Sequence, residues 1–353
     1  MTERTTDIPT MPTRRLGRTG LTVSAFALGT MTFGAEADEV TSHAQLDLFV
    51  ERGGKLIDTA DVYSDGASEE IIGRWAKKRG GMDELIVATK CRFGPTPGSA
   101  GASRRAVRRS LEASLRRLGT EAVDLYFIHG WDKDTDVAET LDVLSDLRRE
   151  GKLHHVGWSN VTGWQLERIV RTAEANGLPA PCALQPQYSL LDRGIEIEVL
   201  PCAIENSIGL TPWSPLGGGW LTGKYDANAR PTGDTRLGDD PNRGVEAYDK
   251  RNNERTHAIL DALRVIARRH GRPPAQVALQ WLLSRPNVSS VLLGARTFGQ
   301  LEGNLDAADL TLTDDDLSEL TRASAPGLPD YPYQFVADWS GVNHWDQMGT
   351  QRA

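Results

Sequence analysis

The chain has 353 residues, of which 39% are hydrophobic and 25% are charged. This balance is typical of a soluble globular protein, and the length is usual for an α/β barrel that forms one domain. The net charge is −8 and no basic block is present, so we expect neither a nucleic-acid nor an anionic-membrane partner. No apolar run has the length of a membrane helix.

The N-terminal segment and the cysteines favour a cytoplasmic protein. Residues 1–13 lack the apolar core of a signal peptide, and we interpret them as a disordered lead-in. Cys91, Cys182 and Cys202 do not have the spacing of metal ligands, which favours three reduced thiols.

Short β-prone runs alternate with helical patterns along the whole chain. The first seven runs begin roughly 30 residues apart, which fits one strand, one helix and two loops, the βαβ unit of a parallel sheet. Eight such runs predict an α/β fold, the (β/α)8 or TIM barrel. The expected strands are residues 23–29, 55–60, 85–90, 122–129, 154–160, 183–189, 209–215 and 289–295.

Helical patterns over residues 103–119, 136–151 and 273–286 separate several of these strands. In the first, apolar residues recur at every third or fourth position with arginines on the opposite face. The first two patterns end at a glycine and the third is bounded by prolines, which are ordinary helix-end signals.

Three segments add to the single barrel domain expected over residues 14–325. The run TRRLGRTGLTVS, residues 13–24, predicts a small β-hairpin that closes the barrel floor. Residues 217–253, after the seventh strand, form a polar Gly- and Pro-rich loop of a length that is usually functional or mobile. The aromatic-rich C-terminal tail, residues 326–353, either docks over the barrel mouth or packs against the outer helices, and the sequence does not decide between them.

Polar or unusual residues follow every predicted strand. Barrel enzymes place their active sites at the C-terminal ends of the strands, so we expect these residues to meet at one rim. They are Gly29-Thr30-Met31, Asp58, Lys90, His129, Ser159-Asn160, Gln185, Trp213-Ser214 and Gly294-Ala295-Arg296, with Tyr63 in the loop after Asp58.

Four of these residues would form a proton relay if they met. A phenol, with a pKa of about 10, is a poor acid at neutral pH, but a nearby ammonium such as Lys90 makes the Tyr63 proton easier to release. Asp58 can hold the ammonium in place, and His129 can orient a carbonyl. This arrangement suits protonation of an oxygen while hydride arrives at its carbon. Singly, each residue has a simpler explanation as a cap, a loop or strand-end residue or a core histidine; together at one rim, those explanations become improbable.

Several other kinds of site are not indicated. The sequence has no G-x-G-x-x-G opening a helix after a strand, no P-loop, no H-E-x-x-H and no Cys/His cluster. It also has no G-x-S-x-G elbow. We therefore expect no Rossmann domain, no metal site and no serine hydrolase.

These motifs resemble those of the aldo-keto reductase superfamily, in the branch related to potassium-channel β subunits and bacterial sugar or general-stress reductases. The similar stretches lie between about Arg14 and Ala325 and are RRLGRTGLTVSAFALGTMTFG, IDTADVYSDGASEEIIGRW, IHGWD, GWSN, TPWSPLGGGWLTGKY and LLGARTFGQLEGNL. The resemblance implies an NADPH-dependent carbonyl reductase that binds its cofactor extended on a TIM barrel.

Carried over from the resemblance, Tyr63 would be the general acid, assisted by Lys90. Asp58 would pair with Lys90, and His129 would orient the carbonyl. The substrate pocket would be formed by Met31, Tyr63, His129 and Trp131.

The resemblance also implies the cofactor site. Ser159, Asn160 and Gln185 would hold the nicotinamide carboxamide, and Trp213 would stack on the ring. Arg296 is the expected ligand of the 2′-phosphate, because a guanidinium forks onto phosphate oxygens. The full set is Gly29, Thr30, Met31, Asp58, Ser159, Asn160, Gln185, Trp213, Ser214, Pro215, Leu216, Gly217, Gly218, Lys224, Arg236, Gly294, Arg296, Gln300 and Asn304, in which Ser214 to Gly218 with Lys224 and Arg236 would cradle the pyrophosphate.

The chain departs from its relatives at three places, and two functional alternatives stay open. Gly303 stands where relatives often have glutamate, Met31 where many have tryptophan, and Pro186-Gln187 replaces a hydrophobic-Glu pair. The predicted function is NADPH-dependent reduction of an aldehyde or ketone. The alternatives are a keto-sugar reductase in glycoside or antibiotic biosynthesis and, from another class, an NADP(H)-sensing regulatory subunit. The substrate, the stereochemistry, the reaction direction and the oligomeric state stay undetermined.

Overall fold

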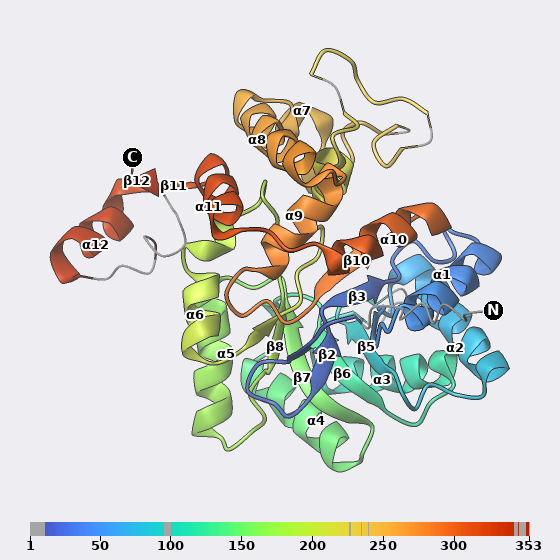
Figure 1. Cartoon of the computed structure of the whole chain (residues 1–353). Helices are drawn as coiled ribbons and strands as arrows, with labels where there is room; N and C mark the ends of the chain where they lie inside the picture. Colours follow the sequence, from blue (N-terminus) through green and yellow to red (C-terminus); the bar gives the residue numbers. More distant parts are fainter. Residues whose placement is uncertain are drawn as a thin grey trace, which may run out of the picture.

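Eight parallel strands form the centre of the structure, a computed structural model that describes residues 11–94, 100–225, 227–233, 235–238, 240–341, 345 and 351–352 (Figure 1). Their order around the sheet is β10-β3-β4-β5-β6-β7-β8-β9. All eight predicted strands are confirmed. They are β3 (Phe26–Gly29), β4 (Leu56–Asp58), β5 (Ile86–Cys91), β6 (Val123–Ile128), β7 (Leu153–Ser159), β8 (Ala183–Gln185), β9 (Gly209–Leu210) and β10 (Val291–Gly294).

The two ends of this sheet are joined by irregular backbone contacts. Leu210 forms a parallel bridge with Val288, just before β10. The Leu210 amide donates to the Asn287 carbonyl at 2.7 Å, and the Leu292 amide donates to the Pro212 carbonyl at 3.1 Å. The sheet therefore closes into the predicted (β/α)8 barrel.

Helices surround the barrel, and the three predicted ones are confirmed. The Ser103 side chain accepts a hydrogen bond from the Ala106 amide at the start of α3, and Gly119 ends that helix in the left-handed conformation, as its sequence indicates. The longer helices are α1 (Glu39–Glu51), α2 (Ala67–Arg79), α3 (Arg104–Leu118), α4 (Val137–Arg149), α5 (Gly163–Ala175), α6 (Val199–Glu205), α8 (Glu254–His270), α9 (Pro274–Leu283), α10 (Phe298–Leu305) and α11 (Asp314–Ala323). None of the helices in the described ranges is both long and apolar enough to cross a membrane.

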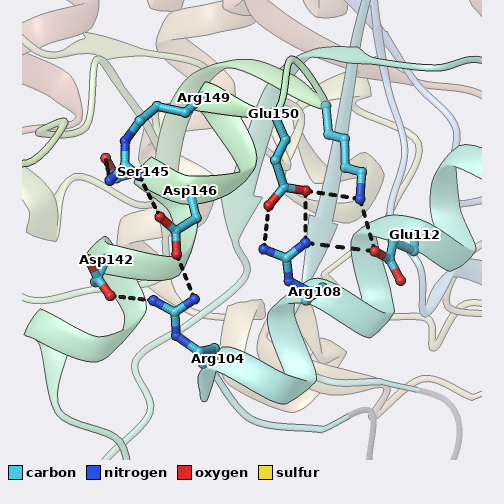
Figure 2. A network of polar contacts seen from close by, with 9 residues as sticks. Arg104, Arg108, Glu112, Asp142, Ser145, Asp146, Arg149 and Glu150 are labelled. Atoms are coloured by element: carbon cyan, nitrogen blue, oxygen red, sulfur yellow. Dashed lines mark hydrogen bonds and ion pairs between the residues drawn. The ribbon is translucent and has the colours of Figure 1, made fainter.

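An ion-pair network joins the exposed sides of α3 and α4 (Figure 2). Arg104 pairs with Asp142 and Asp146, and both terminal nitrogens of Arg108 contact Glu150, at 2.8 and 2.6 Å. Exposed pairs of this kind contribute about 0–1 kcal/mol each, so the network orients α3 against its neighbour more than it stabilises the fold.

The predicted hairpin is present at the barrel floor. Strands β1 (Thr13–Arg15) and β2 (Thr22–Ser24) are antiparallel. Leu16, in the turn between them, is fully buried among side chains of the barrel interior, including Ala27 and Leu125. Gly17 has a φ of +52°, and a Cβ there would lie 2.5 Å from the Cys182 carbonyl oxygen, so this close approach needs glycine.

The long loop after β9 folds around one tryptophan. Trp220 is fully buried and stacks on Tyr248, at 5.5 Å between ring centroids. Its indole N–H donates to the Glu246 carbonyl at 3.2 Å. A short helix, α7 (Tyr248–Arg251), closes the loop before α8.

The described part of the C-terminal tail lies beside α6, outside the barrel (Figure 1). It includes a two-residue strand, β11 (Gly327–Leu328), its parallel partner β12 (Gln351–Arg352) and a short helix, α12 (Phe335–Ser340). The Tyr333 hydroxyl donates to Glu198 at 2.8 Å, and the Trp345 indole donates to the Ile197 carbonyl at 3.0 Å. The described tail residues therefore contact the segment that leads into α6. The predicted lead-in lies mostly in residues 1–10, outside the described residues.

Candidate active site

The four residues of the predicted relay meet at the C-terminal ends of adjacent strands. Asp58 ends β4, Lys90 lies near the end of β5, and His129 directly follows β6. The Lys90 ammonium donates to the Asp58 carboxylate at 2.6 Å and to the Tyr63 hydroxyl at 3.1 Å. The ring centroids of Tyr63 and His129 are 5.9 Å apart, with the rings nearly perpendicular. All four residues therefore lie at one rim of the barrel, as predicted.

A strained turn brings Tyr63 over the mouth. Ser64 and Asp65 have φ angles of 49° and 56°, and Gly66 has a φ of 95°. The Ser64 hydroxyl donates to the Phe33 carbonyl at 2.8 Å and so holds the turn down. Such left-handed residues cost free energy, and they persist where the surrounding structure fixes them.

Lys90 stays charged although it has no contact with solvent. Burial acts to lower the pKa of its ammonium, but attraction to Asp58 and Tyr63, with hydrogen bonds to both, outweighs burial and raises it. The Thr59 carbonyl accepts a further hydrogen bond from the ammonium at 2.8 Å. Lys90 is therefore a fixed positive charge beside the phenol.

The pKa of Tyr63 differs from the sequence-based expectation. Burial raises the pKa of the phenol; Lys90 acts to lower it, as predicted, but does not offset the whole effect. The reason is that the sequence does not report how completely a loop tyrosine is buried. At neutral pH, Tyr63 therefore carries its proton, the form that a proton donor needs.

His129 is a neutral imidazole in this setting. Burial, followed by the nearby charges of Lys90 and Arg92, lowers its pKa to about 3. Its backbone N–H donates to the Cys91 carbonyl at 2.8 Å. Its Nδ1 is buried and makes no hydrogen bond within the described ranges. A neutral ring has one N–H to donate, so His129 can hold a carbonyl oxygen without adding charge.

The residues predicted to hold the nicotinamide form one hydrogen-bonded network with the relay. The Gln185 amide donates to Asp58 at 2.8 Å, and the Ser159 hydroxyl donates to the Gln185 carbonyl at 2.6 Å. The Asn160 amide donates to the His129 carbonyl at 3.0 Å and accepts from the Trp213 indole at 3.1 Å.

Residues at the end of the first barrel strand, β3, also contact the relay. Gly29 is paired with Asp58 in the β3–β4 register. The Thr30 hydroxyl donates to the Asp58 carbonyl at 3.0 Å, and the Met31 side chain is 40% exposed at the rim.

The segment after β9, predicted to cradle a pyrophosphate, is tightly curved. Ser214, Gly217 and Gly218 all have positive φ angles, of 54°, 55° and 64°. A Cβ on Gly218 would lie 2.4 Å from a Glu246 carboxylate oxygen. Arg236, predicted to face the pyrophosphate, ion-pairs with Glu246 at 3.4 Å. Pro215 and Leu216 complete the curve, and Lys224 lies against Gly219.

The residues predicted for the adenosine end gather at α10. Gly294 ends β10, and the Arg296 amide donates to the Gln300 side chain at 2.9 Å. Gln300 and Asn304 are four residues apart on this helix, so they share one face.

Sequence reasoning missed an aromatic rim and a buried acid cluster. The Phe93 ring lies 5.0 Å from the His129 ring, and the Trp131 ring lies 5.5 Å from that of Trp164. Both Phe93 and Trp164 come shortly after a strand, so their position in the chain could have identified them. The second missed group, Asp61 with Glu69, lies behind the relay and gave no comparable signal.

The barrel holds a buried Lys–Asp pair, a protonated phenol and a neutral imidazole at its strand ends. These groups suit an oxidoreductase that acts on a carbonyl–alcohol pair. Comparison with known proteins agrees. The sequence profile described as "Aldo/keto reductase family" matches residues 25–325, and the chain belongs to this family. The predicted family is thus confirmed.

Similar proteins include members with several named roles. Protein tas of Escherichia coli is 34% identical over 341 residues, covering 88% of this chain and 96% of the relative. Norsolorinic acid reductase stcV of Emericella nidulans is 32% identical over 348 residues, covering 94% and 86%. A probable voltage-gated potassium channel subunit beta of Arabidopsis thaliana is 32% identical over 311 residues, covering 85% and 92%.

Proposed function

We propose that this protein reduces an aldehyde or ketone to an alcohol, with NADPH as hydride donor and Tyr63 as general acid. The observation that carries the proposal is the buried Lys90 ammonium, which bonds at once to the Asp58 carboxylate and to the Tyr63 hydroxyl. In this contact the Lys90 ammonium stabilises the phenolate that forms when Tyr63 gives up its proton, as general acid catalysis requires.

Each relay residue has a defined task in this reaction. The cofactor, when bound, supplies hydride to the carbonyl carbon. Tyr63 gives its proton to the carbonyl oxygen, and Lys90 stabilises the phenolate that remains. Asp58 keeps Lys90 in place, and the His129 N–H orients the carbonyl oxygen between itself and Tyr63. General acid assistance of this kind contributes roughly 10²- to 10⁴-fold.

The residues present fit a dinucleotide. Gly217 and Gly218 have left-handed backbone without a Cβ, a conformation that allows another group to approach the main chain closely. Lys224 adds positive charge next to this backbone. Ser159, Asn160 and Gln185 would hold the carboxamide and Trp213 would cover the ring, in keeping with their shared hydrogen bonds.

The adenosine end supports NADPH over NADH. Arg296 lies just before the first turn of α10, with Gln300 and Asn304 following on the helix. A guanidinium at this place can bind a 2′-phosphate through two parallel hydrogen bonds.

The substrate side is apolar, which supports a carbonyl compound with an apolar substituent. The Phe93 ring packs against the His129 ring, and the predicted pocket residues Met31 and Trp131 are also apolar. One relative is named a norsolorinic acid reductase, which agrees with reduction of a small organic substrate. We rank the keto-sugar alternative second, because the side chains of Met31, Phe93 and Trp131 offer few groups for hydrogen bonds to sugar hydroxyls.

The regulatory alternative has support in one relative's name, a potassium channel subunit. A relay that is complete, buried and hydrogen-bonded favours turnover over cofactor sensing alone. Stoichiometric co-purification with a partner, without turnover of any carbonyl compound, would favour the sensor instead.

The deciding experiment follows the absorbance of NADPH with aromatic, aliphatic and sugar carbonyls. Tyr63→Phe should lose at least roughly 10²-fold in turnover. Tyr331→Phe is the matched control, because its ring is 77% exposed on the tail. Near-full turnover by Tyr63→Phe would contradict the mechanism.

A further inference from the structure

Two acids lie behind the relay, between the barrel wall and helices α2 and α3. Asp61 is 1% exposed and Glu69 is 0% exposed. Glu69 is ion-paired with Arg117 at 2.6 Å and accepts a hydrogen bond from the Thr89 hydroxyl at 2.5 Å. Neither carboxyl oxygen of Asp61 makes a hydrogen bond of good geometry within the described part of the chain. Glu69 therefore has its charge matched by Arg117, whereas no cation of the described residues is ion-paired with Asp61.

Asp61 is attached to the relay through the backbone. Its N–H donates to the Lys90 carbonyl at 3.1 Å, and it precedes Tyr63 by two residues. Because charges interact over many ångströms where water is excluded, a negative charge on Asp61 reaches both Lys90 and the Tyr63 phenol.

The surroundings of Asp61 favour its neutral form. Burial and the neighbouring Glu69 charge raise the pKa of Asp61 to about 7, while Ser110, Arg117 and Lys90 act in the opposite direction. The titratable and charged groups that face Asp61 are Tyr63 on its own turn, Glu69 on α2, Lys90 and Cys91 on β5, Arg117 on α3 and Tyr126 on β6. The polar side chain of Ser110, on α3, faces it as well.

We propose that Asp61 is a positioning residue for the reduction, a buried acid whose ionisation sets how readily Tyr63 releases its proton. When Asp61 loses its own proton to solvent, a negative charge stands behind the relay and opposes the phenolate that forms as Tyr63 protonates the substrate. When Asp61 is protonated, this opposition is absent. Asp61 touches neither substrate nor cofactor in this role. This inference rests on the proposed function.

The first test is the pH dependence of reduction at saturating NADPH and substrate, from about pH 5.5 to about pH 9. Turnover by the natural protein should fall about three- to tenfold across a midpoint near 7, since one pKa unit in Tyr63 corresponds to a factor of about ten. Asp61→Asn should stay near its low-pH level. Asp65→Asn is the matched control, because it makes the same change on the same turn at an exposed carboxyl. Asparagine tolerates the positive φ of this residue. Turnover by Asp65→Asn should therefore fall with pH as it does in the natural protein.

The second test does not depend on turnover. The folded pKa of Asp61, about 7, lies above the unfolded value of about 3.9, so the stabilisation from its neutral form is complete below about pH 4 and is lost as the pH rises through about 7. Urea unfolding should show that the natural protein loses more stability than Asp61→Asn between about pH 5 and about pH 8.5. Ser110→Ala removes a group that favours the charged form of Asp61. It should therefore move the midpoints of both pH dependences, that of turnover and that of stability, to higher pH.

The outcomes separate the two proposals. A fall in turnover with the same midpoint in Asp61→Asn, or equal losses of stability in both proteins, would overturn the role of Asp61. Should Asp61→Asn not fold, unmoved midpoints in Ser110→Ala would overturn it. A protein that reduces no carbonyl but shows the stability difference would contradict the proposed function, and with it the catalytic part of the inference, while supporting a neutral Asp61.

Discussion

The Lys90 ammonium and the Asp58 carboxylate are 2.6 Å apart, with side-chain exposures of 0% and 4%. Each side chain offsets part of the other's cost of burial, and Asp58 also accepts from Gln185 at 2.8 Å; burial still outweighs these contacts and raises the pKa of Asp58. The pair therefore links the stability of the barrel mouth to the chemistry of Tyr63, because Lys90 is a partner in both.

Asp58→Asn should lower both stability and turnover. It leaves the Lys90 charge buried without its counter-ion, which costs about 3–5 kcal/mol in comparable buried pairs. We expect urea unfolding to show this loss and NADPH oxidation to show slower reduction. Asp65→Asn should change neither, because that carboxyl is exposed. A stable Asp58→Asn protein with unchanged turnover would show that the pair has no role in either.

His129 should remain neutral throughout the working pH range. Its folded pKa of about 3 lies below the usual value of about 6.5. The stabilisation from its neutral form is therefore complete above about pH 6.5 and is lost as the pH falls toward 3. His129→Asn keeps an N–H donor and should make unfolding less sensitive to acid between about pH 6.5 and about pH 4. Equal acid sensitivity in the two proteins would contradict the buried neutral ring.

The sequence was sufficient to predict the barrel and the four relay residues but not the buried acids behind them. Parallel strands bring their C-terminal ends together, so Asp58, Lys90 and His129 had to meet once the strands were recognised. Strand ends were less certain. The seventh run was predicted over residues 209–215, but β9 stops at Leu210, because Pro212 and Pro215 cannot donate to a ladder.

Side-chain direction and burial account for the other differences. Asp61 follows Asp58 by three residues, and only the folded turn shows that its carboxyl faces α3 and not the mouth. The net direction of the Tyr63 pKa likewise depends on burial, which a pattern of residue types does not report. The pairing of Arg236 with Glu246 arises within a long loop whose path the sequence leaves open.

Trp164→Ala should weaken binding of aromatic substrates. The Trp164 ring is 56% exposed and packs edge-on against Trp131, a predicted substrate-pocket residue. Aromatic contacts of this kind are worth about 0.5–1.5 kcal/mol, so KM for an aryl ketone should rise about two- to tenfold while a small aliphatic aldehyde is unaffected. Trp339→Ala, at a 79% exposed tryptophan on the tail, is the control. Equal effects on both substrate types would argue against a substrate contact at Trp164.

Arg296→Ala should weaken NADPH binding selectively. Loss of a charge-assisted hydrogen bond to a phosphate costs about 1.5–3 kcal/mol, equivalent to roughly 10- to 100-fold in Kd. NADH has no 2′-phosphate, so its Kd should change little. Quenching of tryptophan fluorescence during titration with each cofactor measures both constants. A parallel loss for NADPH and NADH would place Arg296 elsewhere than at the 2′-phosphate.

Gly66→Ala should disturb the turn that carries Tyr63. Gly66 and Gly80 both have a φ of +95°, so alanine is strained at either position by about 1–2 kcal/mol. They differ in surroundings: a Cβ on Gly66 would lie 2.9 Å from the Arg117 side chain, while a Cβ on Gly80 meets nothing within 4 Å. Arg117 cannot move aside freely, because it is paired with the buried Glu69.

Comparison of the two variants isolates the contact from the backbone strain. Gly66→Ala should lose about 1–3 kcal/mol more stability than Gly80→Ala, the usual cost of overpacking. It should also lose turnover, because displacement of the turn moves the Tyr63 hydroxyl away from Lys90, whereas Gly80→Ala should retain turnover. Equal stabilities and equal turnover in urea unfolding and NADPH assays would show that Arg117 yields to the added methyl group and that the turn does not depend on it.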